Sequence, residues 1–280
     1  MFKEKDKEEN LYHTALILGK KIKLGTPKAN IELRKLLQEY GSFKEIYRSF
    51  YPLMNSSEDL ECIHGIENVK REIEGAGEYR TITINDKEFP SRLKNVEDAV
   101  PALYTKGNLD IFNEKTMAVV GTREIYPGKN DLEIKEANEF LEGLLDKKYA
   151  IVSGLANGSD TIAHKYAIEH GGKTIAVIGT SLSKSYPQEN KGLQAKIAEE
   201  HLLVSEYPIG AYVYNSFPLR DKTIASLSEG VVVIKAGDKS GTIHTVREAV
   251  KQGKKIYVLK NNFFEKHEWL TKYKENIEEA

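Results

Sequence analysis

Short apolar segments recur through the middle of the chain and alternate with stretches of helical character. Four of them lie at residues 117–123, 150–160, 174–179 and 202–206, and each opens with a run rich in Val and Ile. The runs are apolar along their whole length rather than alternating, which is typical of strands buried on both faces of a parallel sheet. Repeated β–α units therefore predict an α/β fold with a mostly parallel sheet and helices on both faces.

The loop after the second strand runs from Ser153 to Asp160 and contains Gly154 and Gly158. Ser159 or Asp160 is expected to cap the next helix. Glycines allow close approach to a ligand, and a helix N-terminus offers unpaired N–H groups, so the loop predicts a phosphate cradle at the carboxyl edge of the sheet. For this loop alone, glycines that serve only a tight turn remain the alternative.

Two further loops are expected at the same edge, Gly121-Thr122-Arg123 and Ser240-Gly241-Thr242. Arg123 supplies a guanidinium that can grip a phosphate through two parallel hydrogen bonds, and the second loop supplies amides and hydroxyls at a helix start. A lone Arg after a strand is otherwise a surface ion-pair partner. Convergence of several donor-rich loops favours a binding site.

Charge and one aromatic ring extend this predicted site. Arg220 and Lys222 lie close to Phe217, and cations beside an aromatic ring are the composition that binds single-stranded nucleic acid. Lys184 either extends the basic track or is a solvated loop lysine. The candidate nucleic-acid-binding residues are Gly121, Thr122, Arg123, Ser153, Gly154, Ala156, Asn157, Gly158, Lys184, Phe217, Arg220, Lys222, Ser240, Gly241 and Thr242.

Composition excludes several other classes of protein. The net charge is −1 and 40% of the residues are hydrophobic, so a nucleic-acid site would have to be a local basic patch on an ordinary soluble chain. The single Cys62 fits a reducing cytoplasm, and neither a signal peptide nor a membrane-spanning segment is expected. His164 and His244 have no catalytic partner at a defined spacing, and the histidines show no metal-ligand spacing, so we expect no catalytic residue, metal or cofactor.

Residues 1–78 have a helical pattern distinct from that of residues 79–280, and they predict a small all-α domain. Helices are expected before Gly25, over 31–37, and on either side of Gly65 in 60–73. A core is predicted over 79–262 and a helical tail over 263–280, where Trp269, Leu270, Tyr273 and Ile277 have helical spacing.

Within the predicted core, strands are expected at 81–84, 102–107, 231–235 and 256–259. A helix is expected over 129–147, with an apolar stripe formed by Leu132, Ala137, Phe140, Leu141, Leu144 and Leu145. A second helix is expected near 221–228, after an irregular loop framed by Pro208 and Pro218.

A collinear set of motifs carries a family resemblance over roughly residues 80 to 260. The motifs are F-P-S-R-L-K (89–94), A-L-Y-T-K-G (102–107), V-V-G-T-R (119–123), I-V-S-G-L-A-N-G-S-D-T-I-A-H (151–164), T-I-A-V-I-G (174–179), S-Y-P-Q-E-N (185–190), L-V-S-E-Y-P (203–208), S-F-P-L-R-D-K-T-I-A-S-L-S (216–228) and S-G-T-I-H-T (240–245). In these residues the chain resembles the DNA-processing protein A family (DprA, also called Smf).

The resemblance implies an extended Rossmann fold preceded by a sterile-alpha-motif-like helical domain. It also implies a cytoplasmic, non-enzymatic homodimer that binds and protects single-stranded DNA and helps load RecA recombinase during recombination or natural transformation. The resemblance also points to the same loop residues as the DNA pocket.

The chain departs from the family pattern at three places. Residues 220–222 are R-D-K where Arg-Asn-Arg is expected, so Asp221 brings a negative charge unless it pairs with a neighbouring base. K-N-N (260–262) replaces Pro-Gly, and no winged-helix domain is expected after residue 280.

The rival hypothesis is a small-nucleotide sensor or hydrolase on a related Rossmann-like fold. Such hydrolases carry a Pro-Gly-Gly-x-Gly-Thr-x-x-Glu signature. Here K-A-G-D-K-S-G-T-I-H-T-V-R-E (235–248) keeps Gly241-Thr242 but places Glu248 six residues further on, a spacing that weakens the hydrolase hypothesis.

Overall fold

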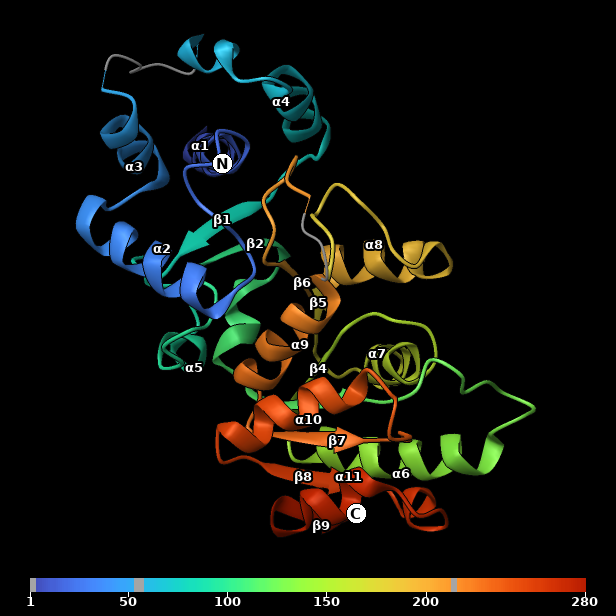
Figure 1. The fold of residues 1–280 in the computed structure, drawn as a ribbon. Coiled ribbons are helices and arrows are strands. Elements are labelled where there is room, and N and C mark those ends of the chain that lie inside the picture. The colour runs from blue at the N-terminus through green and yellow to red at the C-terminus, as the bar shows by residue number, and fades with distance from the viewer. Residues whose placement is uncertain (1–3, 53–57, 213–215) are drawn as a thin grey trace. The chain divides into compact units, whose positions relative to one another are not determined.

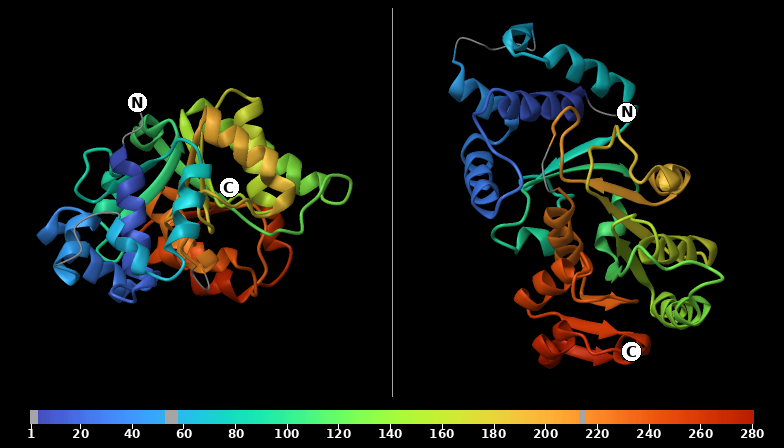
Figure 2. Two further views of the ribbon diagram at one scale, coloured as in Figure 1. Left: turned by 90° about the horizontal axis from the view of Figure 1, so that it is seen from above. Right: turned by 45° about the vertical axis from the view of Figure 1, so that its right-hand side comes forward.

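The computed structural model describes residues 4–52, 58–212 and 216–280, and the chain divides into two compact units (Figures 1 and 2). Unit 1 consists of Met1–Gly107, Gly179–Lys184 and Val204–Leu219, and unit 2 consists of Asn108–Ile178, Ser185–Leu203 and Arg220–Ala280. Each unit is assembled from segments that are distant in sequence.

Unit 1 contains the N-terminal helices and an antiparallel strand pair. Its continuous elements are α1 (Glu4–Leu18), α2 (Pro27–Tyr40), α3 (Phe43–Phe50), η1 (Glu58–Cys62), α4 (Ile66–Gly75), β1 (Arg80–Thr83), α5 (Ser91–Lys94) and β2 (Ala102–Gly107). Side chains fix two of the helix starts, because Thr26 Oγ1 accepts from the Ala29 amide and Ser42 Oγ from the Glu45 amide. Pro27 occupies the first turn of α2, where its missing N–H costs nothing.

The core of unit 1 surrounds α1 and includes polar side chains as well as apolar ones. The ring of His13 stacks on Phe43, and burial lowers the pKa of His13 to about 3. The Asn10 amide pairs with both backbone groups of Ile209, at 3.0 and 3.2 Å. Asp6 accepts from the Thr81 amide, so β1 packs with the N-terminal helices. The predicted domain limits at residues 78 and 262 stay a prediction.

Unit 2 is a parallel α/β assembly. Its elements are η2 (Leu109–Asn113), β3 (Lys115–Val120), α6 (Asp131–Asp146), β4 (Tyr149–Ser153), α7 (Ser159–Glu169), β5 (Thr174–Ile178), η3 (Gln188–Asn190), α8 (Lys191–Glu200), β7 (Gly230–Val233), α10 (Thr242–Lys251), β8 (Lys255–Val258), η4 (Lys260–Phe263), α11 (Glu268–Lys272), η5 (Lys274–Asn276) and β9 (Ile277–Glu279). Two elements, β6 (Leu202–Ser205) and α9 (Ser216–Leu227), are divided between the units.

The strands form a mostly parallel sheet, in which those of unit 2 run in the order β5-β4-β3-β7-β8-β9. Every neighbouring pair in that series is parallel, with Ile151 of β4 opposite Met117 of β3 and Val232 of β7 opposite Val119. The loops after β3, β4 and β7 therefore leave from one edge, which we call the carboxyl edge. The predicted α/β class, with its mostly parallel sheet and N-terminal helical region, is confirmed.

Apolar side chains on one face of this sheet pack against α6 and α7. Met117, Val119 and Ile151 join Ala137 and Leu141 of α6 in one buried cluster, to which α7 contributes Ala163 and Ala167. Helix α10 lies on the opposite face, as the views in Figures 1 and 2 show. Unbroken apolar strands are required here because helices cover the sheet on both sides.

Four details of the sequence prediction are wrong. Leu132 of the predicted stripe is 82% exposed, because helical spacing does not determine how far neighbouring elements cover a helix. Helix α9 begins at Ser216 and includes Pro218 in its first turn, which a helix tolerates. The tail is not one helix, since α11 is followed by η5 and by β9, which pairs with β8. The fourth wrong detail is the predicted capping of α7, which is described with the site below.

In the described residues, no helix is both long and apolar enough to cross a membrane.

Candidate nucleic-acid interface

The loop after β3 is tied to two neighbouring elements of unit 2. The Thr122 amide donates to the carbonyl oxygen of Lys235, which comes after β7, at 2.7 Å. The Thr122 carbonyl accepts from the Ser159 amide at 3.1 Å and from Ser159 Oγ at 3.0 Å. A Cβ atom on Gly121 would collide with Ser159 Oγ, so only glycine permits this approach. These bonds hold the end of β3 against the start of α7.

Arg123 is placed beside the N-terminus of α7 by Gly158. Gly158 has φ +75°, and a Cβ atom there would lie 2.5 Å from the Thr122 oxygen and 2.8 Å from the Arg123 carbonyl carbon. No other residue suits both the backbone conformation and this contact. The Arg123 side chain is exposed. The backbone of Arg123 therefore lies at the carboxyl edge, next to the N-terminus of α7.

The loop from Ser153 to Gly158 uses part of its donor capacity internally. One Asp160 oxygen accepts from the amides of Gly154 and Ala156, both at 3.1 Å, and Ser153 Oγ donates to the Val119 carbonyl. Helix α7 has Gly158 at its N-cap position without a side-chain cap, so the predicted capping by Ser159 or Asp160 is wrong. The Asp160 carboxylate reaches back into the loop instead. Two amides of the predicted phosphate cradle are thus already occupied.

Asp160 is buried, and burial raises its pKa to about 6. The Arg220 guanidinium and the hydrogen bond from the Ala156 amide oppose this shift, whereas Asp221 adds to it. The sequence pattern indicated only a helix cap at Asp160. Its hydrogen-bond partners lie within six residues of it, so the motif contains all the residues of this contact. The motif does not show, however, that the Asp160 side chain points back into the loop.

Asn190 holds the same loop from the other side. Its Nδ2 donates to the Leu155 carbonyl at 2.9 Å and to Thr161 Oγ1 at 2.8 Å. Leu155 is a buried residue with φ +60°, a conformation that non-glycine residues rarely adopt. A bond to its carbonyl helps to retain this backbone geometry. The sequence pattern gave Asn190 no role, because the contact joins residues 35 positions apart.

Arg220 is a buried structural cation. Its side chain is only 4% exposed, and Nη1 donates to the carbonyl oxygens of Gly154 and Val177. Its Nε lies 3.2 Å from Asp221 Oδ1, so the acidic residue is paired with a neighbouring base. Burial raises the pKa of Asp221, and Arg220 and Arg123 oppose that rise. Arg220 therefore shapes the loop after β4 rather than offering charge to solvent.

The remaining predicted residues are distributed over both units. In unit 2, Lys222 of α9 is half-buried, and the Ser240 hydroxyl accepts from the Thr242 amide at 3.3 Å before α10 begins. The topology brings this turn to the carboxyl edge, because it comes after β7, the neighbour of β3. In unit 1, Lys184 is exposed, and the Phe217 ring packs on Gly179, where a Cβ atom would lie 2.6 Å from Cδ1.

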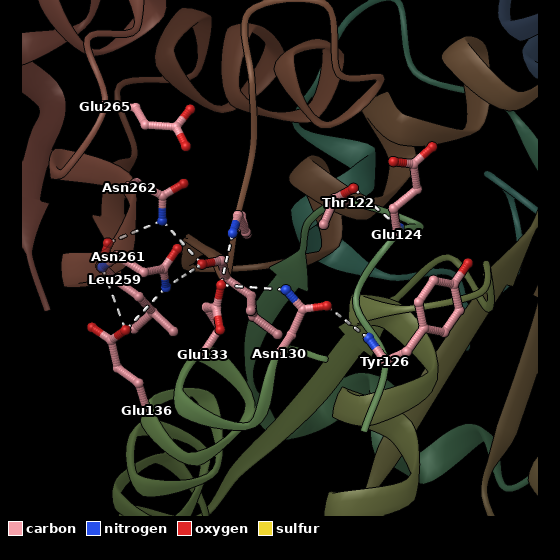
Figure 3. Close-up of polar contacts among 12 residues, drawn as sticks. Thr122, Glu124, Tyr126, Asn130, Glu133, Glu136, Leu259, Asn261, Asn262 and Glu265 are labelled. Carbon is pink, nitrogen blue, oxygen red and sulfur yellow. Dashed lines mark hydrogen bonds and ion pairs between the residues drawn. The ribbon is translucent and has the colours of Figure 1, made fainter. Parts of the chain in front are cut away.

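A polar network supports this edge from the side of α6 (Figure 3). Asn130 accepts from the Tyr126 amide and donates to Glu133, which forms a 2.7 Å ion pair with Lys235. The Glu133 pKa is lowered by its hydrogen bond from Lys235. One turn further along α6, Glu136 accepts from the Asn261 side chain. The K-N-N segment, where the chain departs from the family pattern, thus joins η4 to α6 through this hydrogen bond.

His164 is structural. It is fully buried, its Nδ1 lies 2.7 Å from the Thr174 hydroxyl, and burial lowers its pKa to about 3. Among the described residues, no group of three or more His, Cys, Asp or Glu side chains is arranged to hold a metal ion.

Comparison with known proteins identifies the family. The family model described as DNA recombination-mediator protein A matches residues 80–273, which is more than half of the chain. The chain belongs to this family. It is 39% identical to the DNA processing protein DprA of Streptococcus pneumoniae over 182 residues, covering 65% of this chain and 63% of that protein. It is 33% identical to DprA of Bacillus subtilis over 187 residues, covering 66% and 62%. The chain thus spans less than two thirds of the length of these relatives.

Two solved structures of family members have the same fold. The X-ray structure of DprA from S. pneumoniae aligns with a TM-score of 0.67 at 30% identity, over 89% of this chain and 86% of that one. A structure of DprA from Helicobacter pylori, which concerns its single-stranded DNA binding mode, aligns with a TM-score of 0.62 at 27% identity. That alignment covers 72% of this chain and 90% of the other. The family resemblance of the sequence motifs is confirmed.

Proposed function

We propose that this chain is a recombination mediator that binds single-stranded DNA through its phosphates, protects the strand and helps load RecA recombinase during recombination or natural transformation. The observation that carries the proposal is the position of Arg123. Its side chain is exposed, and its backbone packs against Gly158 at the N-terminus of α7. An exposed arginine whose backbone lies at a helix N-terminus is suited to binding a phosphate group.

The chemistry of the carboxyl edge favours a polymer lying across the surface over a small nucleotide enclosed in the loop. The amides of Gly154 and Ala156 already bond Asp160, and Arg220 is buried against backbone carbonyls. A nucleotide phosphate that bound these two amides would have to displace a buried carboxylate. Exposed groups such as Arg123 and the Ser240 turn can instead contact successive phosphates of a strand. Because the net charge is −1, this attraction is local.

Further properties of the proposed function rest on membership in the family. We infer that the protein acts without a catalytic centre, works in the cytoplasm as a homodimer, and contacts RecA. The structure of the H. pylori family member supports the choice of ligand, since its subject is the binding of single-stranded DNA.

A competition experiment tests the choice of ligand. Binding of a labelled single-stranded oligonucleotide is measured across salt concentrations and then challenged with its duplex and with a panel of free nucleotides. We expect saturable binding that weakens as salt rises and that free nucleotides do not displace. Stronger binding of a free nucleotide, seen as displacement or as thermal stabilisation of the protein, would contradict the proposal.

A further inference from the structure

A second concentration of positive charge lies in unit 1, between α1 and α2. Lys20, Lys21, Lys23 and Lys28 fall within the segment Gly19–Ile31, which contains no acidic residue. We call these four residues the lysine cluster. All four side chains are exposed. In a chain with a net charge of −1, this is a pronounced local excess of positive charge.

The lysine cluster surrounds a hollow. The four lysines line a pocket of about 390 Å³ whose floor includes the buried residues Ile22, Ala29 and Leu33. Glu32 is the acidic residue among the lining groups, and its carboxylate lies 4.0 Å from Lys28 Nζ, with both side chains largely exposed. Such an exposed ion pair contributes little to stability, so Lys28 can exchange Glu32 for another anion at low cost.

The other lysines of the cluster are not engaged by carboxylates. Elsewhere in unit 1, Lys44 pairs with Glu8 at 2.6 Å and Lys70 with Glu67 at 3.1 Å. Within the described residues of unit 1, no ion pair involves Lys20, Lys21 or Lys23. Among the described residues of unit 1, exposed lysines outside the cluster, such as Lys7 and Lys35, also form no ion pair, so the cluster is distinguished by its position around one hollow.

Aromatic rings flank the cluster. Lys21 Nζ lies 5.1 Å from the centre of the Tyr51 ring and 5.8 Å from that of Phe50, which is 39% exposed. Gly19 leaves room for this arrangement, because a Cβ atom there would lie 2.8 Å from the Tyr51 hydroxyl. Cations interleaved with aromatic rings bind single-stranded nucleic acid, since phosphates meet the cations and bases stack on the rings.

We propose that the lysine cluster is a second binding surface for single-stranded nucleic acid, in which the lysines contact phosphates and Phe50 and Tyr51 face the bases. This inference rests on the proposed function, since it assumes the same class of ligand. A membrane surface fits less well. The apolar groups Ile22 and Leu33 form the floor of the pocket, whereas membrane binding requires apolar side chains that project outward.

The test combines the substitutions Lys20→Ala, Lys21→Ala, Lys23→Ala and Lys28→Ala in the full chain, and binding of labelled oligothymidine is measured across salt. We expect at least about tenfold weaker binding at moderate salt, and a salt slope smaller in magnitude by about 2 to 3, because each lost phosphate contact removes about 0.7. Replacing the same four lysines by Arg should restore both quantities.

A matched control removes four exposed lysines near the opposite, amino edge of the sheet in unit 2: Lys115→Ala, Lys147→Ala, Lys173→Ala and Lys255→Ala. It should change the binding much less, although it alters the net charge equally. Urea unfolding of both variants confirms that they are folded. Equal effects of the two variants would overturn the inference. So would a cluster variant that loses binding to phosphatidylserine vesicles but keeps its binding to oligothymidine.

The Arg123→Ala variant, measured in parallel, separates this inference from the proposed function. If Arg123→Ala weakens binding and the cluster variant does not, the second surface is refuted and the carboxyl-edge site stands. If the cluster variant alone weakens binding, the second surface stands and the carboxyl-edge site is refuted. Absence of oligothymidine binding by the unsubstituted chain would contradict both.

Discussion

The carboxyl edge of unit 2 and the lysine cluster of unit 1 use positive charge in opposite ways. At the carboxyl edge, Arg220 is buried and bonded to carbonyl oxygens, whereas the Arg123 side chain is exposed. In the lysine cluster, all four cations are exposed and the apolar groups lie beneath them. Both regions look basic in the sequence, yet only exposure determines which charges can reach a ligand.

The difference shows that a charged residue in a binding motif can act by building the loop rather than by touching the ligand. Arg220 and Asp160 neutralise donors and acceptors that the loop after β4 would otherwise leave buried and unpaired. A buried, paired charge is costly to break, whereas an exposed charge is cheap to remove. Changes at the two regions should therefore separate stability from binding.

The largest expected effect is on stability, from Arg220→Ala. Removing the guanidinium leaves the Gly154 and Val177 carbonyls and the Asp221 carboxylate without their partner. We expect the free energy of unfolding to fall by about 3 to 5 kcal/mol. For Lys23→Ala in the exposed cluster we expect a change within about 0.5 kcal/mol. Urea unfolding of both variants measures the difference. Similar losses of unfolding free energy would contradict the claim that the two regions use their charges differently.

Gly158→Ala should be the next most damaging change. Its φ of +75° disfavours alanine, and the new methyl group would lie 2.5 Å from the Thr122 oxygen. We expect a loss of about 3 kcal/mol in unfolding free energy. Gly128→Ala is the control, because Gly128 has φ +81° but nothing within 4 Å of its Cβ position. That variant should lose only about 1 kcal/mol. Equal losses in thermal or urea unfolding would show that the contact with the Thr122–Arg123 backbone is unimportant.

Asp160 predicts a smaller, pH-dependent effect. Folding raises its pKa from the ordinary 3.8 to about 6, so the folded state binds this proton more tightly than the unfolded state. The associated stability is fully present below 3.8 and is lost as the pH rises through about 6. We expect Asp160→Asn to remove about 3 kcal/mol of this decline. Unfolding measured across that range in both proteins tests it, and parallel curves would exclude Asp160 as the titrating group.

Local sequence patterns predicted the parallel α/β architecture of unit 2, although they missed its last strand, β9. The apolar runs correctly placed β3, β4 and β5, because strands buried on both faces must be apolar throughout. The parallel order then required the loops after β3, β4 and β7 to leave from one edge. Such features depend on the period of the sequence and on the handedness and direction of β–α units.

The hydrogen bonds and ion pairs inside the site could not be predicted, because they join segments that are distant in sequence. Arg220 bonds carbonyls 66 and 43 residues away, and nothing in its local sequence distinguishes a buried guanidinium from an exposed one. The role of Asn190 is hidden for the same reason. The lysine cluster is local in sequence, but its members do not stand out among 41 basic residues until the fold places them around one hollow.

The most direct test of the proposed mechanism compares the two ends of one strand. Arg123→Ala removes a cation just after β3, and Lys115→Ala removes an exposed one at its first residue, about 20 Å away for six strand residues. Salt titration of single-stranded DNA binding should give a slope smaller in magnitude by about 0.7 for Arg123→Ala, with several-fold weaker affinity, and no change for Lys115→Ala. Identical slopes and affinities for the two variants would contradict phosphate capture at the carboxyl edge.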